Sequence, residues 1–159
     1  MPLTLNPGSG EALAGTVRAV LEQKGWAVHS IAPNATVYDA IAKMDELMVG
    51  ALFVIEDSSL VGVISERDYA RKVILRDRAS KHTLVREIMT TPVIYVEAST
   101  PLSECMRIIN SERVRHLPVM EAGKLVGVVS IGDVVRTIIA QQADKIEYMN
   151  TLMTDPYPG

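Results

Sequence analysis

The stretch that decides the fold, VIEDSSLVGVISERDYAR, occupies residues 54–71 and recurs as VMEAGKLVGVVSIGDVVR at residues 119–136. The match extends without a gap in both directions, so that Val28–Ile74 can be laid on Val93–Ile139. A tandem duplication produces two similar halves, and two similar halves create a cleft between them. The repeat therefore favours a paired binding site over a single catalytic centre.

Each copy predicts the element order strand, helix, strand, strand, helix. In the first copy a short strand lies near Val28–Ile31, and a helical apolar stripe follows through Met48. Two apolar runs of strand length come next, Ala51–Ile55 and Leu60–Ile64, joined by the polar turn Glu56–Ser59. Neither small sheet can bury both of its faces alone. We therefore expect an α/β (α+β) fold in which two β-α-β-β-α repeats pack with pseudo-twofold symmetry.

The remaining sequence predicts helices on either side of the repeats. Leu13, Val17 and Leu21 recur at helical spacing within Ser9–Lys24, and Gly25 ends this helix. A helical pattern also continues beyond the second copy until the prolines of DPYPG. The predicted organisation is a tail and helix at 1–27, a first repeat at 28–80, a linker with the second repeat at 81–140, and a helix with a tail at 141–159.

Composition narrows the possible functions. The chain has 159 residues, of which 48% are hydrophobic, and a net charge of −3, so it has no general attraction for nucleic acid or for an anionic membrane. The N-terminus does not resemble a secretory signal, and the apolar runs are too short to span a bilayer. Cys105, the only cysteine, cannot form an internal disulfide. We expect a cytoplasmic protein that does not act at a membrane.

The motif with the clearest chemistry is G-h-h-S-x-x-D, where h is apolar, at the end of the third predicted strand. It places Ser65 and Asp68 in the first copy and Ser130 and Asp133 in the second. A carboxylate at a helix start accepts two hydrogen bonds from a vicinal diol such as that of ribose, and the exposed amides there favour a phosphate. The alternative is a simple helix capping box, which is compatible with ligand binding.

These motifs, together with the VREIMTTPV segment and VRHLPVMEAGKLVGVVSIGD, resemble a tandem cystathionine β-synthase (CBS) domain pair, also called a Bateman module. The resemblance covers about residues 28–139. It implies that adenosine-containing ligands bind in clefts between the repeats, among them AMP, ADP, ATP, NAD(H) and S-adenosylmethionine. It further implies that Asp68 and Asp133 hold the ribose.

The same resemblance assigns the rest of each site. Similarity to the nucleotide-sensing subunit of AMP-activated protein kinase implies that Arg115 and His116 contact phosphates, although a solvated pair at a strand start is the alternative. The aspartate sites would each draw on both repeats, and apolar side chains would lie against adenine. The implied residues are Thr100, Val114 and His116 for Asp68, Thr36, Val49, Gly50 and Arg115 for Asp133, and Ile64 and Val129 for adenine.

The two copies differ beside the motif. Arg67 puts a cation in the first turn of a helix, where it opposes the helix dipole unless a polyphosphate binds. The alternative is a surface arginine paired with Glu66 or Asp68. Gly132 takes this position in the second copy and supplies no charge. We therefore expect the two sites to bind a given ligand unequally.

No catalytic or metal site is predicted. His29, His82 and His116 have no cysteine or carboxylate at ligand spacing, and no nucleotide-cleaving or hydrolase motif occurs. The favoured function is a stand-alone sensor that is not an enzyme and that signals to a separate effector protein, with a homodimer as the default assembly. The alternatives are a structural dimer module that has lost its ligand and, third, a nucleotide-acting enzyme. Nucleic-acid binding is disfavoured.

Overall fold

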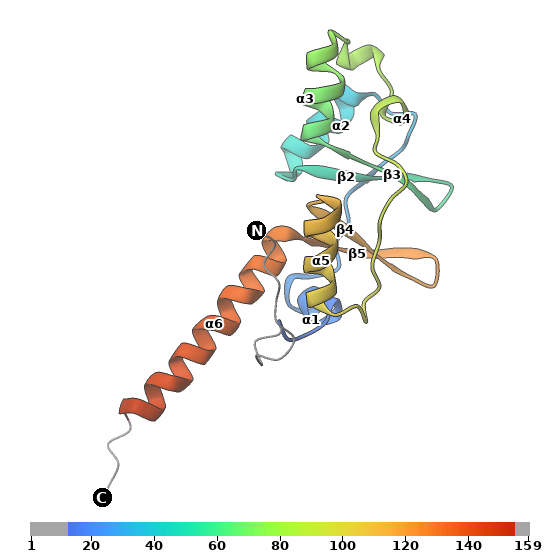
Figure 1. The fold of residues 1–159 in the computed structure, drawn as a ribbon. Coiled ribbons are helices and arrows are strands. Elements are labelled where there is room, and N and C mark those ends of the chain that lie inside the picture. The colour runs from blue at the N-terminus through green and yellow to red at the C-terminus, as the bar shows by residue number, and fades with distance from the viewer. Residues whose placement is uncertain (1–12, 155–159) are drawn as a thin grey trace, which may run out of the picture.

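The computed structural model describes residues 13–154 and shows the predicted mixed architecture as two stacked halves (Figure 1). The first repeat comprises β1 Ser30–Ile31, α2 Val37–Leu47, β2 Ala51–Glu56, β3 Ser59–Ser65 and α3 Glu66–Lys72. The second comprises α5 Leu102–Glu112, β4 His116–Glu121, β5 Lys124–Ser130 and α6 Ile131–Thr154. Its opening strand is reduced to a parallel bridge between Val96 and Val119.

Both hairpins turn more tightly than the sequence predicted. Glu56 pairs with Ser59, so that only Asp57 and Ser58, with φ of 50° and 67°, form the first turn. Ala122 and Gly123, with φ of 50° and 77°, form the second. Two consecutive positive φ values define the turn type whose twist matches that of the flanking strands. The predicted four-residue joins are therefore two-residue turns, and the strands are correspondingly longer.

The N-terminal helix is shorter than predicted. α1 spans Val17–Lys24, whereas the apolar spacing predicted a helix from Ser9; residues 9–12 lie outside the described residues. Gly15 has a φ of 100°, which a helix does not allow, and its carbonyl accepts a hydrogen bond from the amide of Leu102 at 3.0 Å. The backbone before α1 is therefore paired with the second repeat instead of being helical.

Each repeat is completed by the segment that precedes the other repeat. Val17, Val20 and Leu21 of α1 are buried in the core of the second repeat. α4, Val85–Ile88, lies between the repeats in sequence, yet its two end residues are buried in the core of the first. Part of the segment assigned to 81–140 therefore packs on the first repeat, and the chain crosses between the halves in both directions.

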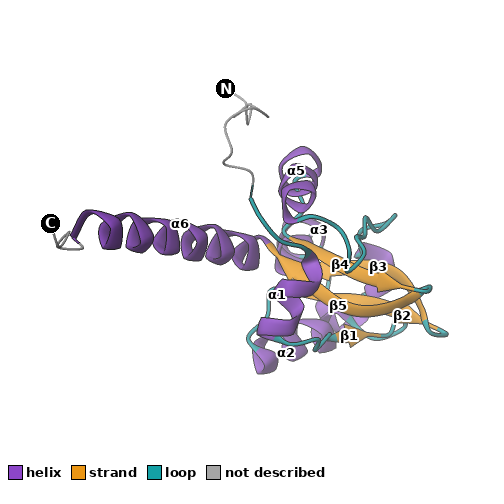
Figure 2. Ribbon diagram, turned by 90° about the horizontal axis from the view of Figure 1, so that it is seen from below, coloured by secondary structure: helices purple, strands orange, loops and turns teal. Residues whose placement is uncertain are grey.

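The two crossings make equivalent backbone contacts, as pseudo-twofold symmetry requires. Thr16 bridges Pro101 before α5, and Leu84 bridges Thr36 before α2. Two short 3₁₀ turns, Ile74–Arg76 and Ser80–His82, connect α3 to α4. Figure 2 shows the strands of both halves together on one side of the molecule, and β3 and β5 are in contact where the halves meet. The final helices α3 and α6 consequently begin at the same end of the paired sheets.

α6 is much longer than its counterpart α3. It runs for 24 residues, and its C-terminal part extends away from both halves (Figures 1 and 2). This agrees with the predicted continuation of the helical pattern to Leu152, while DPYPG lies outside the described residues. Across residues 13–154, none of the helices combines the length and apolar character required to cross a bilayer.

Gly127 of the repeated motif is tightly packed against Leu21 of α1. A Cβ at this position would lie 2.8 Å from Cδ1 of Leu21, whose side chain is fully buried. We therefore expect Gly127→Ala to cost about 1–3 kcal/mol of unfolding free energy through overpacking, measured by urea denaturation. In a Leu21→Ala background the same substitution should cost much less, because the clash is gone. Equal costs in both backgrounds would show that the contact does not limit residue size.

Candidate functional site

Both Ser-x-x-Asp motifs form capping boxes at the start of the final helix of their repeat. Oγ of Ser65 accepts a hydrogen bond from the Asp68 amide at 3.1 Å, and Oδ2 of Asp68 accepts one from the Ser65 amide at 2.9 Å. Ser130 and Asp133 repeat the arrangement at 3.1 and 2.8 Å. The capping interpretation is therefore correct at both motifs, and it fixes each carboxylate at the end of a buried strand.

Asp68 has further partners besides its cap. Its Oδ1 accepts a hydrogen bond from the Thr90 hydroxyl at 3.1 Å and lies 3.0 Å from Nζ of Lys72. The same ammonium donates to the carbonyl of Ile88 at 2.8 Å. Only 9% of Asp68 is exposed. A buried carboxylate needs such partners, because an unpaired charge in this environment is costly.

Asp133 is held by two cations. Its Oδ2 lies 2.6 Å from Nζ of Lys24, the last residue of α1, and its Oδ1 lies 2.6 Å from an Nη atom of Arg136. The Arg136 guanidinium reaches back over Gly132, whose missing side chain leaves it room. Asp133 is 5% exposed. The second site is therefore richer in positive charge than the first.

This charge sets the protonation states at the second site. Burial alone would raise the pKa of Asp133, but hydrogen bonds from Lys24 and the Ser130 amide, with help from Arg136, hold it below its usual value. Burial lowers the pKa of His116, and Lys24 lowers it further against the opposing effect of Asp133. Asp133 is therefore ionised and His116 neutral at pH 7.

The crossing segments supply one partner to each aspartate. Thr90 follows α4 and contacts Asp68 of the first repeat, whereas Lys24 ends α1 and contacts Asp133 of the second. Each of these residues precedes the repeat that it does not contact. Each aspartate therefore caps its own helix and also holds the crossing segment that completes the core of its own half.

Two predicted phosphate ligands are exposed and unpaired in the described part of the chain. Arg67 is exposed and makes no ion pair there with Glu66 or Asp68, so the pairing in the alternative explanation is not seen, whereas its surface position is. The Arg115 carbonyl accepts a hydrogen bond from the Ile131 amide at 2.8 Å, which places Arg115 beside the start of α6. This position agrees with its predicted assignment to the Asp133 site.

Two residues that the resemblance assigned to the aspartate of the other repeat, Gly50 and His116, make their contacts beside the aspartate of their own repeat. The Gly50 carbonyl accepts from the Glu66 amide at 3.0 Å, so Gly50 lies beside the start of α3, and this contact gives no support to its assignment to the Asp133 site. His116 pairs with Ser130 across the hairpin and lies within electrostatic reach of Asp133, although it was assigned to Asp68. Both residues adjoin the final helix of their own repeat because β2 and β4 begin where β3 and β5 end.

The predicted adenine contacts need correction. Ile64 and Val129 have no exposed surface and belong to the two cores, so neither is available to a ligand in this structure. Successive residues of a strand point to opposite faces. Their neighbours Val63 and Val128 are partly exposed on the other face and are the better candidates.

The other implied residues serve local structure. The Thr36 hydroxyl accepts a hydrogen bond from the Asp39 amide at the start of α2, at 3.1 Å. The Thr100 hydroxyl accepts from the Glu97 amide at 3.0 Å. Val49 and Val114 pack against the cores of their own repeats. The contacts of these four residues neither support nor exclude a role in a ligand site.

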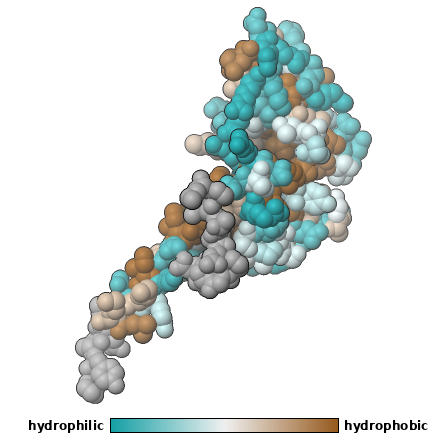
Figure 3. Space-filling view, viewed as in Figure 1, coloured by the Kyte–Doolittle hydropathy of each residue, from teal (hydrophilic) through white to brown (hydrophobic). Residues whose placement is uncertain are grey.

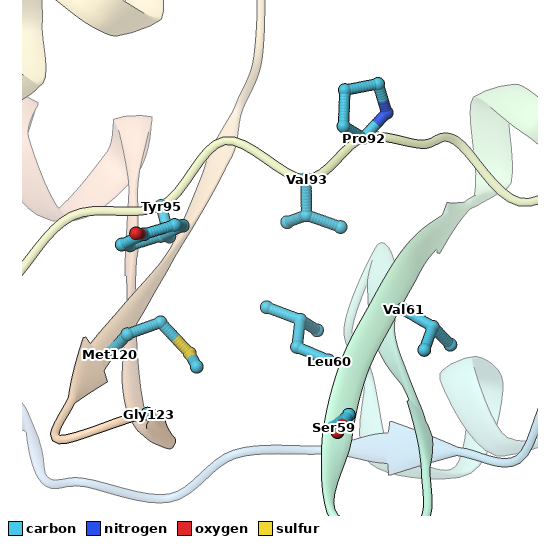
Figure 4. Close-up of a pocket in the computed structure, with 8 residues that line it drawn as sticks. All are labelled: Ser59, Leu60, Val61, Pro92, Val93, Tyr95, Met120 and Gly123. Atoms are coloured by element: carbon cyan, nitrogen blue, oxygen red, sulfur yellow. The ribbon is translucent and has the colours of Figure 1, made fainter.

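A hollow of about 420 Å³ lies at the opposite end of the strands from the aspartates. It is bounded by Ser59–Val61 at the start of β3, by the second hairpin and by the crossing segment at Pro92–Tyr95. Figure 4 shows Leu60, Val93 and Met120 pointing towards one another across it. Its lining is largely apolar and offers no charged group. It is therefore not the site that the motifs predict.

Several site residues were not found by sequence reasoning: Lys24, Lys72, Thr90 and Arg136. Lys72 follows Asp68 by four residues, a spacing that brings side chains together on a helix, and Arg136 recurs as Arg71 in the first copy. These two had a detectable signal. Lys24 lies outside the repeat and far from Asp133 in sequence, so internal comparison could not identify it.

Neither metal nor thiol chemistry is indicated within residues 13–154. No group of three histidine, cysteine or acidic side chains in this region is arranged to hold a metal. Cys105 is fully buried, and burial is the main cause that raises the pKa of its thiol to about 11. The thiol is therefore protonated at neutral pH.

Comparison with known proteins places the chain in a family. The CBS domain model matches residues 26–75 and 85–140, and the chain belongs to the CBS-domain family. It is 36% identical over 151 residues to the mitochondrial CBS domain-containing protein CBSX3 of Arabidopsis thaliana, covering 89% of this chain and 73% of that protein.

Solved structures agree in fold. A putative signal-transduction protein with CBS domains from Burkholderia ambifaria is 47% identical, with a TM-score of 0.78 and coverage of 80% of this chain and 96% of that one. CBSX2, solved in complex with AMP, is 29% identical, with a TM-score of 0.66 and coverage of 81% and 99%. The expected family and pseudo-symmetric CBS fold are thereby confirmed.

The Lys24–Asp133 pair should make stability depend on pH. Because the pKa of Asp133 is lowered on folding, its contribution is present above the ordinary aspartate pKa of about 3.9 and is lost as the pH falls through the folded value. We expect Lys24→Ala to reduce the unfolding free energy more at pH 7 than at pH 3, measured by urea denaturation. Lys124→Ala, which removes an exposed lysine at the far end of β5, is the control. An equal loss at both pH values would contradict the assignment.

Proposed function

We propose that this chain is a regulatory sensor that binds AMP, ADP, ATP or NAD(H) at the starts of α3 and α6 and signals to a partner protein. One observation carries the proposal: two equivalent buried carboxylates, each ion-paired, lie in sites that also hold an exposed arginine. Family membership and the AMP complex of CBSX2 support the ligand class.

Ligand binding in this scheme is an exchange of partners. Asp133 already accepts hydrogen bonds from Lys24 and Arg136, and Asp68 accepts one from Thr90 and forms an ion pair with Lys72. The two hydroxyls of a ribose would replace some of these donors at similar geometry. The displaced ammonium or guanidinium would remain nearby and favour the phosphate of the same ligand.

The exchange provides a route for signalling. Lys24 and Thr90 belong to the two crossing segments, so replacing them at an aspartate loosens the tie between a repeat and the crossing segment that completes its core. A ligand can shift an equilibrium between packings only by the difference in its affinity for them. Here that difference would come from the ion pairs and hydrogen bonds that the ribose breaks.

The two sites should differ in ligand preference. The α6 site has Lys24, Arg136 and Arg115 close to one aspartate, whereas the α3 site has Lys72 and Arg67. We therefore propose that the α6 site prefers the more highly phosphorylated ligand, since each further phosphate adds negative charge that these cations can neutralise.

Two other functions are weaker. A structural module that has lost its ligand would explain why both carboxylates have hydrogen-bond and ion-pair partners within the protein, but it leaves the exposed Arg67 and Arg115 without a role. An enzyme is disfavoured because the relatives are described as CBS-domain or signal-transduction proteins and not as enzymes. We also propose a homodimer and a separate effector protein, as the sequence suggested.

Removing the carboxylates tests the proposal. We expect Asp68→Ala and Asp133→Ala each to weaken one site by about 1–3 kcal/mol, and the double variant to reduce the thermal shift given by whichever of AMP, ADP, ATP, NAD+, NADH and S-adenosylmethionine binds the wild type. Asp39→Ala is the matched control, because it removes the equivalent Thr-x-x-Asp carboxylate from α2. Wild-type affinity in the double variant would reject the ribose assignment.

Removing Arg115 tests the phosphate assignment. The guanidinium should contribute through charged hydrogen bonds of about 1.5–3 kcal/mol. Arg115→Ala should therefore weaken ADP binding roughly tenfold or more while leaving adenosine binding nearly unchanged, measured by calorimetry. Lys124→Ala serves again as a control of equal charge. Parallel losses for ADP and adenosine would argue against a phosphate contact.

A further inference from the structure

From Ile139 onwards, α6 carries an apolar stripe that nothing in the described chain covers. Ile139, Ile146 and Met149 are 61%, 58% and 51% exposed, and Met153 is also exposed. Figure 3 shows hydrophobic side chains along the helix that extends from the body. An isolated helical segment of roughly 12–15 residues, about the length of α6 beyond Ile139, is marginal in water unless one of its faces packs against another element. The stripe therefore calls for a partner.

The spacing of the stripe identifies the kind of partner. Val135, Ile139, Gln142, Ile146, Met149 and Met153 follow one another at intervals of four, three, four, three and four residues. This is the a/d pattern of a left-handed coiled coil, in which the seam faces a second helix with the same repeat. Leu152, which is 62% exposed, lies at the neighbouring g position and widens the apolar face near the end of the helix.

The body of the protein leaves this seam accessible. α6 faces its own repeat through Val134, Ile138 and Gln141, since the first two pack in the second core and the third bonds to Ala14. The seam is displaced from these positions by one residue, which corresponds to about 100° around the helix. A second helix can therefore lie along α6 without displacing the contacts to the repeat.

Gln142 selects both the partner and its direction. It lies inside the seam, where an apolar partner would leave its amide unsatisfied. In a parallel, in-register pair of identical helices Gln142 faces its own copy, and the two amides can bond to each other. In the antiparallel alignment that pairs Ile139 with Met149, Gln142 would face Ile146. Isoleucine at the a positions, Ile139 and Ile146, also favours two-stranded coils.

We propose that two copies of this chain associate through a parallel coiled coil formed by Ile139–Met153 of α6. The seam is short, so the association is a concentration-dependent equilibrium between monomer and dimer. It places the α6 sites of two copies at the same end of one zipper. This surface is distinct from any contact between the repeats and does not depend on nucleotide binding.

The mass in solution tests the proposal. The full chain should show a dimer that dissociates on dilution by sedimentation velocity, and Ile146→Glu with Met149→Glu should weaken it by at least tenfold. Tyr148→Glu with Thr151→Glu, which adds the same charge on the outer face, should leave it unchanged. Gln142→Ile should tighten it, because the polar residue fixes register at a cost in stability.

A cysteine cross-link tests direction. Ile139→Cys should give a disulfide-linked dimer only in the parallel arrangement, and the buried, protonated Cys105 will not compete. A wild-type chain that stays monomeric, or a dimer that survives the glutamate pair as it survives its control, would overturn the coiled coil. Thermal shifts with nucleotides in the same variants report the proposed function independently, so the two can fail separately.

Discussion

The ion-paired aspartate at the start of each final helix is the interaction on which the arrangement depends. Asp68 and Asp133 cap their own helices and at the same time hold a residue of the segment that crosses from the other half. Neither repeat could be cut away intact, because each core contains side chains from the opposite crossing. In each half, helix capping, completion of the core and the candidate ligand site therefore depend on the same pairing of an aspartate with a crossing segment.

The two aspartate sites differ in charge while keeping the same capping geometry. At Asp68 the crossing segment supplies a neutral hydroxyl, and at Asp133 it supplies an ammonium, with Arg136 added. Gly132 makes the second arrangement possible, since a side chain there would meet the guanidinium. A duplication that began with equal halves has in this way acquired two electrostatically different sites.

The sequence predicted most of what recurs within the repeat, with Arg136 as an exception, and did not predict what lies outside it. The strand-helix order, the family and the motif residues Ser65, Asp68, Ser130 and Asp133 followed from self-comparison and local periodicity. Lys24 was beyond reach, because tertiary folding alone brings α1 to Asp133. The choice of Ile64 and Val129 over Val63 and Val128 was a one-residue error of strand face, and strict use of the period of two would have avoided it. The start of α1 failed because Gly15 adopts a backbone conformation that apolar spacing does not reveal.

The position of Lys24 at the end of α1 has a thermodynamic consequence. If ribose replaces this ammonium at Asp133, binding weakens the hold of the second repeat on α1, and linkage requires the reverse coupling to be equally strong. A partner protein that binds the N-terminal segment and separates α1 from β5 would then raise the affinity of the α6 site for its ligand by the same factor. The N-terminal segment would thus both respond to ligand binding and control the ligand affinity of the α6 site.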